Sequence, residues 1–534
     1  MNRLKKLIER FEKSHISLKG MLITFLCIIF LRNFLETFSD SDNLWRPAGS
    51  LAFFVHYPLF YVCLLLALSI LFSRLTKERI ERSSQIVLLF FPIVLLAPIL
   101  DLLISGGQGY NISYLFYDLP RLIRKFIPFF SHYEGQGATP GIQIELIIAF
   151  ILAGLYLYVK TGKIIRAAIG IIGFYMIVFL LGAIPSLVTI LWKVKDSFVS
   201  AKELFSGEVV LSHFYSFNHK IALVLFPIFI VELVIWSWCF DRRKCLSVLR
   251  NLRGLRVMHY VFMLGLGMIL AYFRTTNLNL LDSPFPILII ATSFGSGILA
   301  WCYAVGINDK SDLETDHISN PSRPLVSGAI TSQEHRVINT IFLISSLVAA
   351  DLVRYPFFIS MVVIIGLSYI YSCPPLRIKR IPILSKFVIA TCSAITCLAG
   401  FLVFSDDYSF NGFPPVIILT ILVTVTLAFN VIDIKDWAGD PITGTKTLPV
   451  ILGDKKGKRV IGVLVFLSYL CIPLFLKSYA LFKITLVFGI ISYLLINRKT
   501  MQETPIFLLY IVFLVITLCY FYAQMINGVQ TILG

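Results

Sequence analysis

The sequence predicts an all-α, polytopic membrane protein with about 15 transmembrane helices. Hydrophobic residues make up 57% of the 534 residues, and charged residues make up only 14%. Apolar runs follow one another from end to end, most of them close to the roughly 20 residues that a helix needs to cross a bilayer. These two observations exclude a soluble globular protein. We therefore expect an integral, multi-pass protein that resides in the lipid bilayer of the cell membrane.

The apolar runs form a group of six followed by a group of nine. The first group lies near 17–35, 51–73, 85–105, 142–159, 167–192 and 221–240. The second group lies near 257–273, 285–307, 337–353, 355–372, 384–405, 414–432, 460–476, 480–496 and 505–527. The division predicts an N-terminal membrane domain of unknown function at 1–240, a basic linker at 241–256 and a second membrane domain at 257–534. No removable signal peptide is evident, so the first helix is expected to remain as an anchor.

The net charge of +17 reflects membrane topology. Most of the 47 Lys and Arg residues lie in alternate loops between the apolar runs, the distribution that the positive-inside rule describes. This distribution predicts a cytoplasmic N-terminus and cytoplasmic loops after the runs near 285–307 and 414–432. Because the basic residues are explained by topology and lipid headgroups, we expect no nucleic-acid partner. The ten cysteines show no metal-ligand spacing.

Two acidic clusters follow apolar runs in the second half. Residues 308–316 read Asn-Asp-Lys-Ser-Asp-Leu-Glu-Thr-Asp, and residues 433–440 read Asp-Ile-Lys-Asp-Trp-Ala-Gly-Asp. On a continuing helix, spacings of three and four residues place most of the polar side chains of each cluster on one face. These residues are Asn308, Asp312 and Asp316 in the first cluster, and Asp433, Asp436 and Asp440 in the second.

Crowded carboxylates repel one another, and a divalent cation relieves that repulsion most simply. Magnesium suits oxygen ligands and usually binds through one or two carboxylates together with phosphate oxygens and water. A single acidic loop is more often a solvated surface, but the same pattern occurs twice at predicted cytoplasmic helix ends. The clusters therefore predict one or two Mg²⁺ ions shared with a diphosphate.

Three ordered motifs resemble those of the UbiA superfamily of intramembrane prenyltransferases. They are NDxxDxxxD at 308–316, YSxPPxRxK at 371–379, and DxxDxxGD followed by GxxTLP at 433–449. The resemblance covers residues near 255–534 and implies a nine-helix bundle. It does not extend to the first 240 residues.

The resemblance implies an Mg²⁺-dependent enzyme that transfers an alkyl group other than methyl from a prenyl diphosphate. By motif position, it implies seven metal-binding or supporting residues: Asn308, Asp309, Asp312, Asp316, Asp433, Asp436 and Asp440. The implied diphosphate contacts are Arg323, Arg377 and Lys379. The implied catalytic residues are Asp312, Asp436, Asp440 and Tyr371, although Tyr371 equally suits an aromatic belt at the membrane interface. Two further cations, Arg380 and Lys386, are explained by topology alone.

The acceptor stays open at this point. The family implies a hydrophobic acceptor, and both an aromatic, quinone-precursor-like acceptor and a lipid-ether acceptor fit the motifs. A phosphoribosyl-type transferase is a further variant. A CDP-alcohol phosphotransferase would also use clustered aspartates, but the DGxxAR element is missing after either cluster.

The first half offers fewer signals. A transporter or lipid-handling scaffold would suit it, and Glu232 is an acid within an apolar run. Arg32 and Glu36 are four residues apart and are expected to pair. Two Gly-Gln-Gly elements at 107–109 and 135–137 are typical of turns. The mixed aromatic and basic residues at 114–130 predict a helix on the membrane surface.

Overall fold

The computed structural model describes most of the chain, and the named secondary-structure elements in that part are all helices. The described residues are 2–12, 17–39, 50–110, 113–126, 133, 135–192, 200–206, 216–273, 280, 283–405, 410, 412–437, 439, 441 and 444–526. Among these residues, 14 helices are long and apolar enough to cross a membrane. The prediction of an all-α, polytopic protein is confirmed. The run near 17–35 forms helix α2 (Leu18–Ser39), which carries Lys19, Arg32 and Glu36 and is not among the 14.

The chain divides into two compact units. Unit 1 comprises Met1–Cys245 and Asn279–Leu288, and unit 2 comprises Leu246–Leu278 and Ile289–Gly534. The segment expected to be a basic linker contains helix α12 (Arg242–Arg250). The functional division at 241–256 stays a prediction.

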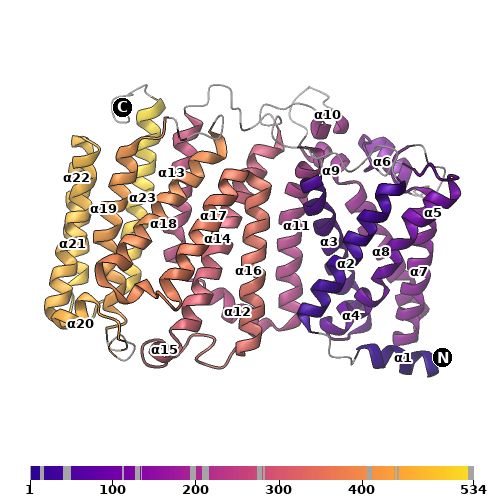
Figure 1. Cartoon of the computed structure of the whole chain (residues 1–534), viewed down its shortest axis with the longest axis horizontal. Coiled ribbons are helices and arrows are strands. Elements are labelled where there is room, and N and C mark those ends of the chain that lie inside the picture. Colours follow the sequence, from indigo (N-terminus) through magenta and orange to yellow (C-terminus); the bar gives the residue numbers. More distant parts are fainter. Residues whose placement is uncertain are drawn as a thin grey trace. The chain divides into compact units, whose positions relative to one another are not determined.

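Unit 1 is built around helix α3, which packs against α11, α4 and α8 (Figure 1). Its remaining long helices include α7, which packs against α5 and α8. Helix α6 begins within the segment expected to lie on the membrane surface, of which residues 127–130 lie outside the described part. The elements are α1 (Asn2–Glu12), α2 (Leu18–Ser39), α3 (Ser50–Thr76), α4 (Ile80–Phe90), η1 (Phe91–Leu95), α5 (Leu96–Ile104), α6 (Leu119–Phe126), α7 (Pro140–Thr161), α8 (Ile164–Gly182), α9 (Ile184–Leu191), α10 (Ala201–Ser206) and α11 (Phe217–Phe240).

Charged side chains inside unit 1 pair with one another. Arg32 lies 2.6 Å from Glu36, as the four-residue spacing predicts, and 3.7 Å from Glu145. Glu232 lies beside Cys63 on the neighbouring helix α3. Because ionic groups away from water are stable only when compensated, the Arg32 pairs contribute to holding α2 and α7 together.

Unit 2 is a bundle around helix α18, which packs against α13, α17 and α19. Gly267 on α13 and Gly400 on α18 allow these two helices to approach each other closely. A Cβ atom on Gly267 would lie 1.9 Å from the Cys397 carbonyl oxygen, and one on Gly400 would lie 2.0 Å from the Leu264 carbonyl oxygen. Small residues allow membrane helices to approach backbone to backbone, so α13 and α18 form a rigid seam.

Among the helices of unit 2, the short elements α15 and α20 both lie at the bottom end of the bundle in Figure 1. The elements are α13 (Gly254–Tyr272), α14 (Pro284–Ser311), α15 (Leu313–Ser319), α16 (Ser332–Val353), α17 (Tyr355–Ser372), η4 (Ile378–Arg380), α18 (Pro382–Phe404), α19 (Pro415–Ala428), η6 (Phe429–Ile434), α20 (Leu448–Leu452), α21 (Asp454–Phe475), α22 (Tyr479–Ile496) and α23 (Glu503–Ile526).

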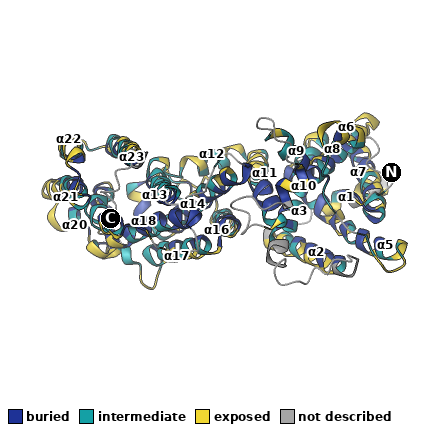
Figure 2. Cartoon of the chain, turned by 90° about the horizontal axis from the view of Figure 1, so that it is seen from above, coloured by how far each residue is buried: buried dark blue, intermediate teal, exposed yellow. Residues whose placement is uncertain are grey.

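Within each unit, buried residues line the helix contacts and exposed residues lie on the outward faces (Figure 2). Many of the exposed residues are large and apolar, for example Ile164, Ile383 and Leu494, which are 71%, 79% and 59% exposed. Such faces suit contact with lipid tails rather than water.

Candidate functional site

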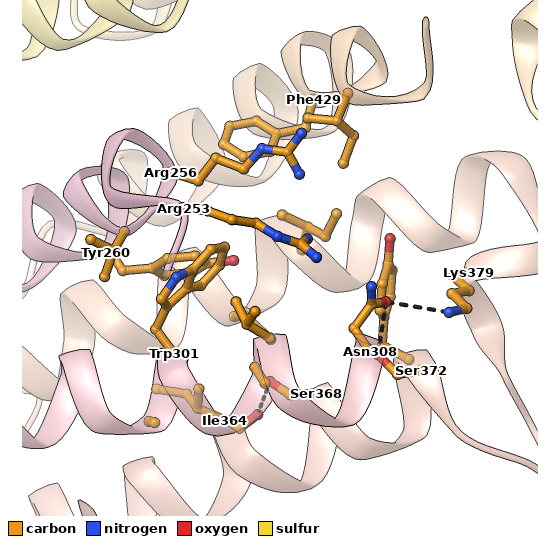
Figure 3. Close-up of a pocket in the computed structure, with 18 of the residues that line it drawn as sticks. Arg253, Arg256, Tyr260, Trp301, Asn308, Ile364, Ser368, Ser372, Lys379 and Phe429 are labelled. Atoms are coloured by element: carbon orange, nitrogen blue, oxygen red, sulfur yellow. Dashed lines mark hydrogen bonds between the residues drawn. The ribbon is translucent and has the colours of Figure 1, made fainter. Parts of the chain in front are cut away.

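Unit 2 contains a cavity of about 210 Å³ whose lining changes from polar to apolar. Its walls come from α13, α14, α15, α17, α18 and η6. The polar part includes Asn308, Asp312 and Lys379, and the apolar part includes Leu264 and Ile364. Figure 3 shows Arg253 and Arg256 on one wall and Asn308 and Lys379 on another.

The first acidic cluster lies where α14 passes into α15. The α-helix is interrupted at Asp312, whose φ and ψ are −106° and 18°. Helical hydrogen bonds nevertheless continue, since the Asp312 amide donates to the Asn308 carbonyl at 2.9 Å and the Asp316 amide donates to the Asp312 carbonyl at 2.8 Å. Asn308, Asp312 and Asp316 consequently all line the cavity, as the four-residue spacing predicts.

The second acidic cluster does not continue the α-helix that the sequence predicts. Helix α19 ends at Ala428 and is followed by the 3₁₀ helix η6. The Asn430 side chain donates to the carbonyls of Thr426 and Leu427 at 3.0 and 3.1 Å, and such bonds compete with the helical backbone pattern. The tighter turn still brings Asp433 and Asp436 to the cavity. Asp440 lies outside the described residues.

The basic loop after α17 meets the first acidic cluster. The Lys379 ammonium contacts Asp312 Oδ1 and lies 3.3 Å from Asn308 Oδ1. Arg377 donates to Asp312 Oδ1 at 3.3 Å and to the Ser311 carbonyl at 2.8 Å. Burial lowers the pKa of Lys379, an effect that Asp312 opposes. This loop contains a cis Pro374–Pro375 bond. The contacts of Arg377 and Lys379 bring both cations to Asp312 of the first acidic cluster.

Asn320 links the two acidic clusters. Its side-chain amide donates to Asp316 Oδ1 at 3.1 Å and to Asp436 Oδ1 at 3.2 Å. Asp316 also contacts Arg323. Burial raises the pKa of Asp316 to about 6, and Arg323 opposes that rise. The two clusters thus share one hydrogen-bonded network.

Among the described residues predicted to hold the metal, Asp309 alone does not line the cavity, and Arg377 of the predicted diphosphate contacts is also outside the lining. Asp309 is 3% exposed and accepts hydrogen bonds from Asn251 and Arg253, both at 2.6 Å. Arg323 lies 3.2 Å from the same carboxylate. Asp309 therefore positions two arginines that reach the cavity, since Arg253 and Arg323 both line it.

Three basic residues at or next to the cavity are not predicted as site residues by the sequence. Arg253 and Arg256, which line the cavity, fall in the predicted basic linker, and Lys386, which lies behind Asp433, is explained there by topology. Lys386 is 2% exposed and donates to Asp433 Oδ1 at 2.5 Å. Its place inside the apolar run 384–405 was the available signal, because an intramembrane cation needs a partner. Burial lowers the pKa of Arg253.

Aromatic side chains also face the cavity. Tyr260, Trp301, Tyr371 and Phe429 line it. The Trp301 indole donates to the Leu252 carbonyl at 2.7 Å, and the rings of Tyr260 and Trp301 lie 5.3 Å apart. Tyr371 is the one of these four that the sequence motifs include.

The donor atoms at the polar end suit a hard divalent cation. Among the described residues, no group of three or more His, Cys, Asp or Glu side chains is arranged to hold a metal ion. The lining does supply oxygen ligands from Asn308, Asp312 and Asp436, which is the ligand type that magnesium prefers. The contacts of the Lys379 ammonium with Asn308 and Asp312 show that a cation is accommodated between these two side chains.

Comparisons with known proteins agree with the motifs. A family model described as the UbiA prenyltransferase family matches residues 260–505. The digeranylgeranylglyceryl phosphate synthase of Sulfolobus acidocaldarius is 31% identical over 208 residues, which cover 37% of this chain and 71% of that protein. The enzyme of the same name from Saccharolobus solfataricus is 30% identical over 171 residues, so the match spans 58% of its length and 32% of this chain.

Two further similarities are more distant. The homogentisate phytyltransferase of a Synechocystis species is 29% identical over 202 residues, which cover 36% of this chain and 63% of that protein. A solved UbiA homolog from Archaeoglobus fulgidus, bound to GPP and Mg²⁺, has 18% identity and a TM-score of 0.40 over 53% of this chain and 98% of its own.

Proposed function

The chain belongs to the UbiA prenyltransferase family, and on that premise we propose that it transfers a prenyl group from a prenyl diphosphate to a hydrophobic acceptor within the membrane. The observation that carries this proposal is the convergence of the two acidic clusters and the basic loop on one cavity. That cavity is polar at the end where a diphosphate would bind and apolar where a prenyl chain would lie. The proposed topology places this polar end at the cytoplasmic side.

The proposed metal ligands are Asn308, Asp312 and Asp436, with Asp440 as a further candidate from its motif position. Bound Mg²⁺ supplies positive charge to the diphosphate leaving group. Lys379, Arg377 and Arg323 are the proposed diphosphate contacts, because guanidinium and ammonium groups form strong charge-assisted hydrogen bonds with phosphate oxygens. Asp316 and Asp433, which also line the cavity, pair with Arg323 and Lys386, and this pairing supports a positioning role for them at the metal site.

The side chains of the cavity fit ionisation of an allylic diphosphate. When the carbon–oxygen bond breaks, negative charge grows on the leaving diphosphate, and cations already aimed at that position stabilise the transition state more than the bound substrate. The remaining allylic cation is stabilised by aromatic faces, which Tyr260, Trp301, Tyr371 and Phe429 provide. Apolar walls exclude water until the acceptor attacks the cation and loses a proton.

Two acceptor classes have specific support. Arg253 and Arg256 line the polar part of the cavity, and they suit an acceptor with an anionic head. Relatives named digeranylgeranylglyceryl phosphate synthase make the phosphate-bearing glyceryl lipid our first choice. A relative named homogentisate phytyltransferase supports an aromatic acid as the second.

Mass spectrometry of the product tests the proposal. The purified full-length chain is incubated with Mg²⁺, an isotopically labelled prenyl diphosphate, and either a glycerophosphate lipid or an aromatic acid. We expect release of one diphosphate for each prenylated product formed. Absence of diphosphate release across both acceptor panels and several prenyl chain lengths would contradict the proposal.

A further inference from the structure

A second cavity lies entirely within unit 1. Its volume is about 450 Å³, compared with about 210 Å³ for the cavity of unit 2. Helices α3, α4, α7 and α8 and η1 form most of its walls. None of the motifs of the prenyltransferase family lies in this unit.

The cavity is long and follows two neighbouring helices. Its lining on α3 runs from His56 to Phe72, which corresponds to about 24 Å of helix at 1.5 Å per residue. Its lining on α7 runs from Ile142 to Tyr156, or about 21 Å by the same rise. These lengths approach the hydrocarbon thickness of a bilayer. The cavity therefore suits an extended chain better than a compact ligand.

One end of the cavity is aromatic and hydrogen-bonding. His56 Nδ1 lies 3.0 Å from Asn218 Oδ1, and His56 Nε2 contacts the Tyr114 hydroxyl. The rings of Tyr114 and Phe217 lie 5.8 Å apart, and those of His56 and Tyr57 lie 4.8 Å apart. A planar polar group would stack between such rings while exchanging hydrogen bonds with them.

The same end is covered by one of the two Gly-Gln-Gly elements. Gly137, which lines the cavity, donates its amide to the Ser113 carbonyl at 3.1 Å. Gln136 Oε1 accepts from the Phe116 amide at 3.4 Å. The element that the sequence marks as a turn thus forms part of the cavity wall.

The opposite end of the cavity is lined by apolar side chains, and side-chain ion pairs lie behind them. The rings of Phe72 and Tyr156 lie 5.8 Å apart, and the Tyr156 hydroxyl donates to Glu12 at 3.2 Å. Lys160 lies 2.8 Å from both Glu12 and Glu78. An apolar tail would end against these rings.

An arginine in the cavity wall is compensated by two carboxylates. Arg32 and Lys202 are the cations of the lining, and Glu145 is its acid. Arg32 lies 2.6 Å from Glu36, behind the lining, and 3.7 Å from Glu145. Because two carboxylates offset Arg32, this arginine does not favour an anionic head. The cavity of unit 2 is more densely charged, since four cations and four aspartates line it.

We propose that the unit 1 cavity binds one molecule of a lipid with a single long apolar tail and a planar, uncharged, hydrogen-bonding head of the quinone or phenol type. The head lies by His56 and Tyr114, and the tail extends between α3 and α7 towards Phe72. The proposal does not depend on the reaction of unit 2, because it concerns binding alone.

Native mass spectrometry of the full-length chain in detergent tests this site. The probes are decylubiquinone, decylubiquinol and decyl phosphate, which share a tail and differ in head. We expect one decylubiquinone or decylubiquinol to bind per chain, and decyl phosphate to bind about tenfold more weakly, a difference of roughly 1.4 kcal/mol. Comparison of the affinities of the two neutral probes shows whether the site prefers a quinone or a phenol head. Failure of both to bind, or equal binding of decyl phosphate, overturns the proposal.

A matched pair of variants on α7 locates the site. Ala149 lines the cavity, whereas Ile151 on the same helix is 62% exposed on the outer face. We expect Ala149→Phe to weaken binding of the neutral probe at least about tenfold and Ile151→Phe to leave it unchanged. Equal effects of the two variants, or displacement of the probe by geranyl diphosphate, would place the lipid elsewhere and reject this site.

A hydroxyl deletion provides a second test that disturbs packing less. Tyr114→Phe removes one hydroxyl at the head end, and Tyr158→Phe removes one that lies outside the cavity lining. We expect about three- to tenfold weaker binding for Tyr114→Phe, as for one lost hydrogen bond, and no change for Tyr158→Phe. Size-exclusion profiles check that each variant is folded. Unchanged affinity of folded Tyr114→Phe contradicts the assignment of the head end.

Discussion

The ion pairs of Arg32 in unit 1 are less exposed than the ion pairs of Asp312 in unit 2. In unit 1, the side chains of Arg32, Glu36 and Glu145 are 3%, 2% and 9% exposed. In unit 2, those of Asp312 and Arg377 are 19% and 15% exposed. Arg32 and Glu145 line a cavity as well, but their side chains are almost completely covered, whereas the more exposed Asp312 and Arg377 can exchange partners with an incoming ion or diphosphate. Access to a cavity is therefore not enough to mark a buried charge as a reaction site, and the exposure of the charged groups matters as well.

Removal of Mg²⁺ should produce the largest difference between the behaviour of the two units. With excess EDTA we expect transferase activity to fall below detection, because the diphosphate charge is then left without its metal. The thermal unfolding of unit 1 should not change, since the proposed metal ligands all lie in unit 2. The measurement is diphosphate release together with a thermal melt. EDTA already saturated with Mg²⁺ is the control, and activity that persists in free EDTA would contradict a metal-dependent site.

Asp312→Asn should cause the next largest loss. It keeps the size of the side chain but removes the charge that Lys379 and Arg377 face. We expect kcat to fall about 100- to 1,000-fold, the range for loss of one preorganised electrostatic contact. Glu314→Gln, an exposed position in the same motif, is the matched control. Equal rates for the two variants would remove Asp312 from the proposed site.

Arg32→Met should affect stability rather than reaction rate. It leaves Glu36 and Glu145 buried without their cation, which costs about 3 kcal/mol of unfolding free energy. Arg79→Met, at an exposed pair whose arginine is 75% exposed, should change stability by less than about 0.5 kcal/mol. Chemical unfolding in mixed micelles measures both. If Arg32→Met is as stable as Arg79→Met, the buried pairs of unit 1 are not structural.

Asn320→Ala should give the smallest effect of the four. It breaks the hydrogen bonds that join Asp316 to Asp436, and the loss of about 1 kcal/mol corresponds to about a fivefold lower kcat/KM. Asn497→Ala, which removes a side-chain bond to the Tyr493 carbonyl away from the cavity, is the control. A loss as large as that of Asp312→Asn would indicate that Asn320 itself contacts substrate.

The sequence predicted the parts of the site that depend on local spacing. Asn308, Asp312 and Asp316 are four residues apart, so one helical face brings them together even though the helix breaks at Asp312. Motif similarity implied that Lys379 and Arg377 serve the same site, as diphosphate contacts. In the structure both approach Asp312, because the loop after α17 returns to the end of α14.

Contacts made across the fold were not predicted. Asp309 is adjacent to Asn308 but projects from another side of the helix, where it meets Asn251 and Arg253. In the sequence, Lys386 fits the positive-inside pattern as a cytoplasmic loop cation. It pairs with Asp433 because α18 packs beside η6, a contact that the sequence pattern does not show. In η6, the Asn430 side chain bonds carbonyls of the preceding turn, and composition does not single out this residue.

The glycine seam between α13 and α18 restricts how the reaction cavity of unit 2 can change. Neither Gly267 nor Gly400 leaves room for a methyl group, so the spacing between α13 and α18 cannot change by substitution at either glycine without separating two backbones. The cavity volume is therefore set by the side chains that line it, such as Leu264 on α13, Phe294 on α14 and Met361 on α17. An engineered change in the length of prenyl chain that the cavity accepts should be sought at these side chains and not at the two glycines.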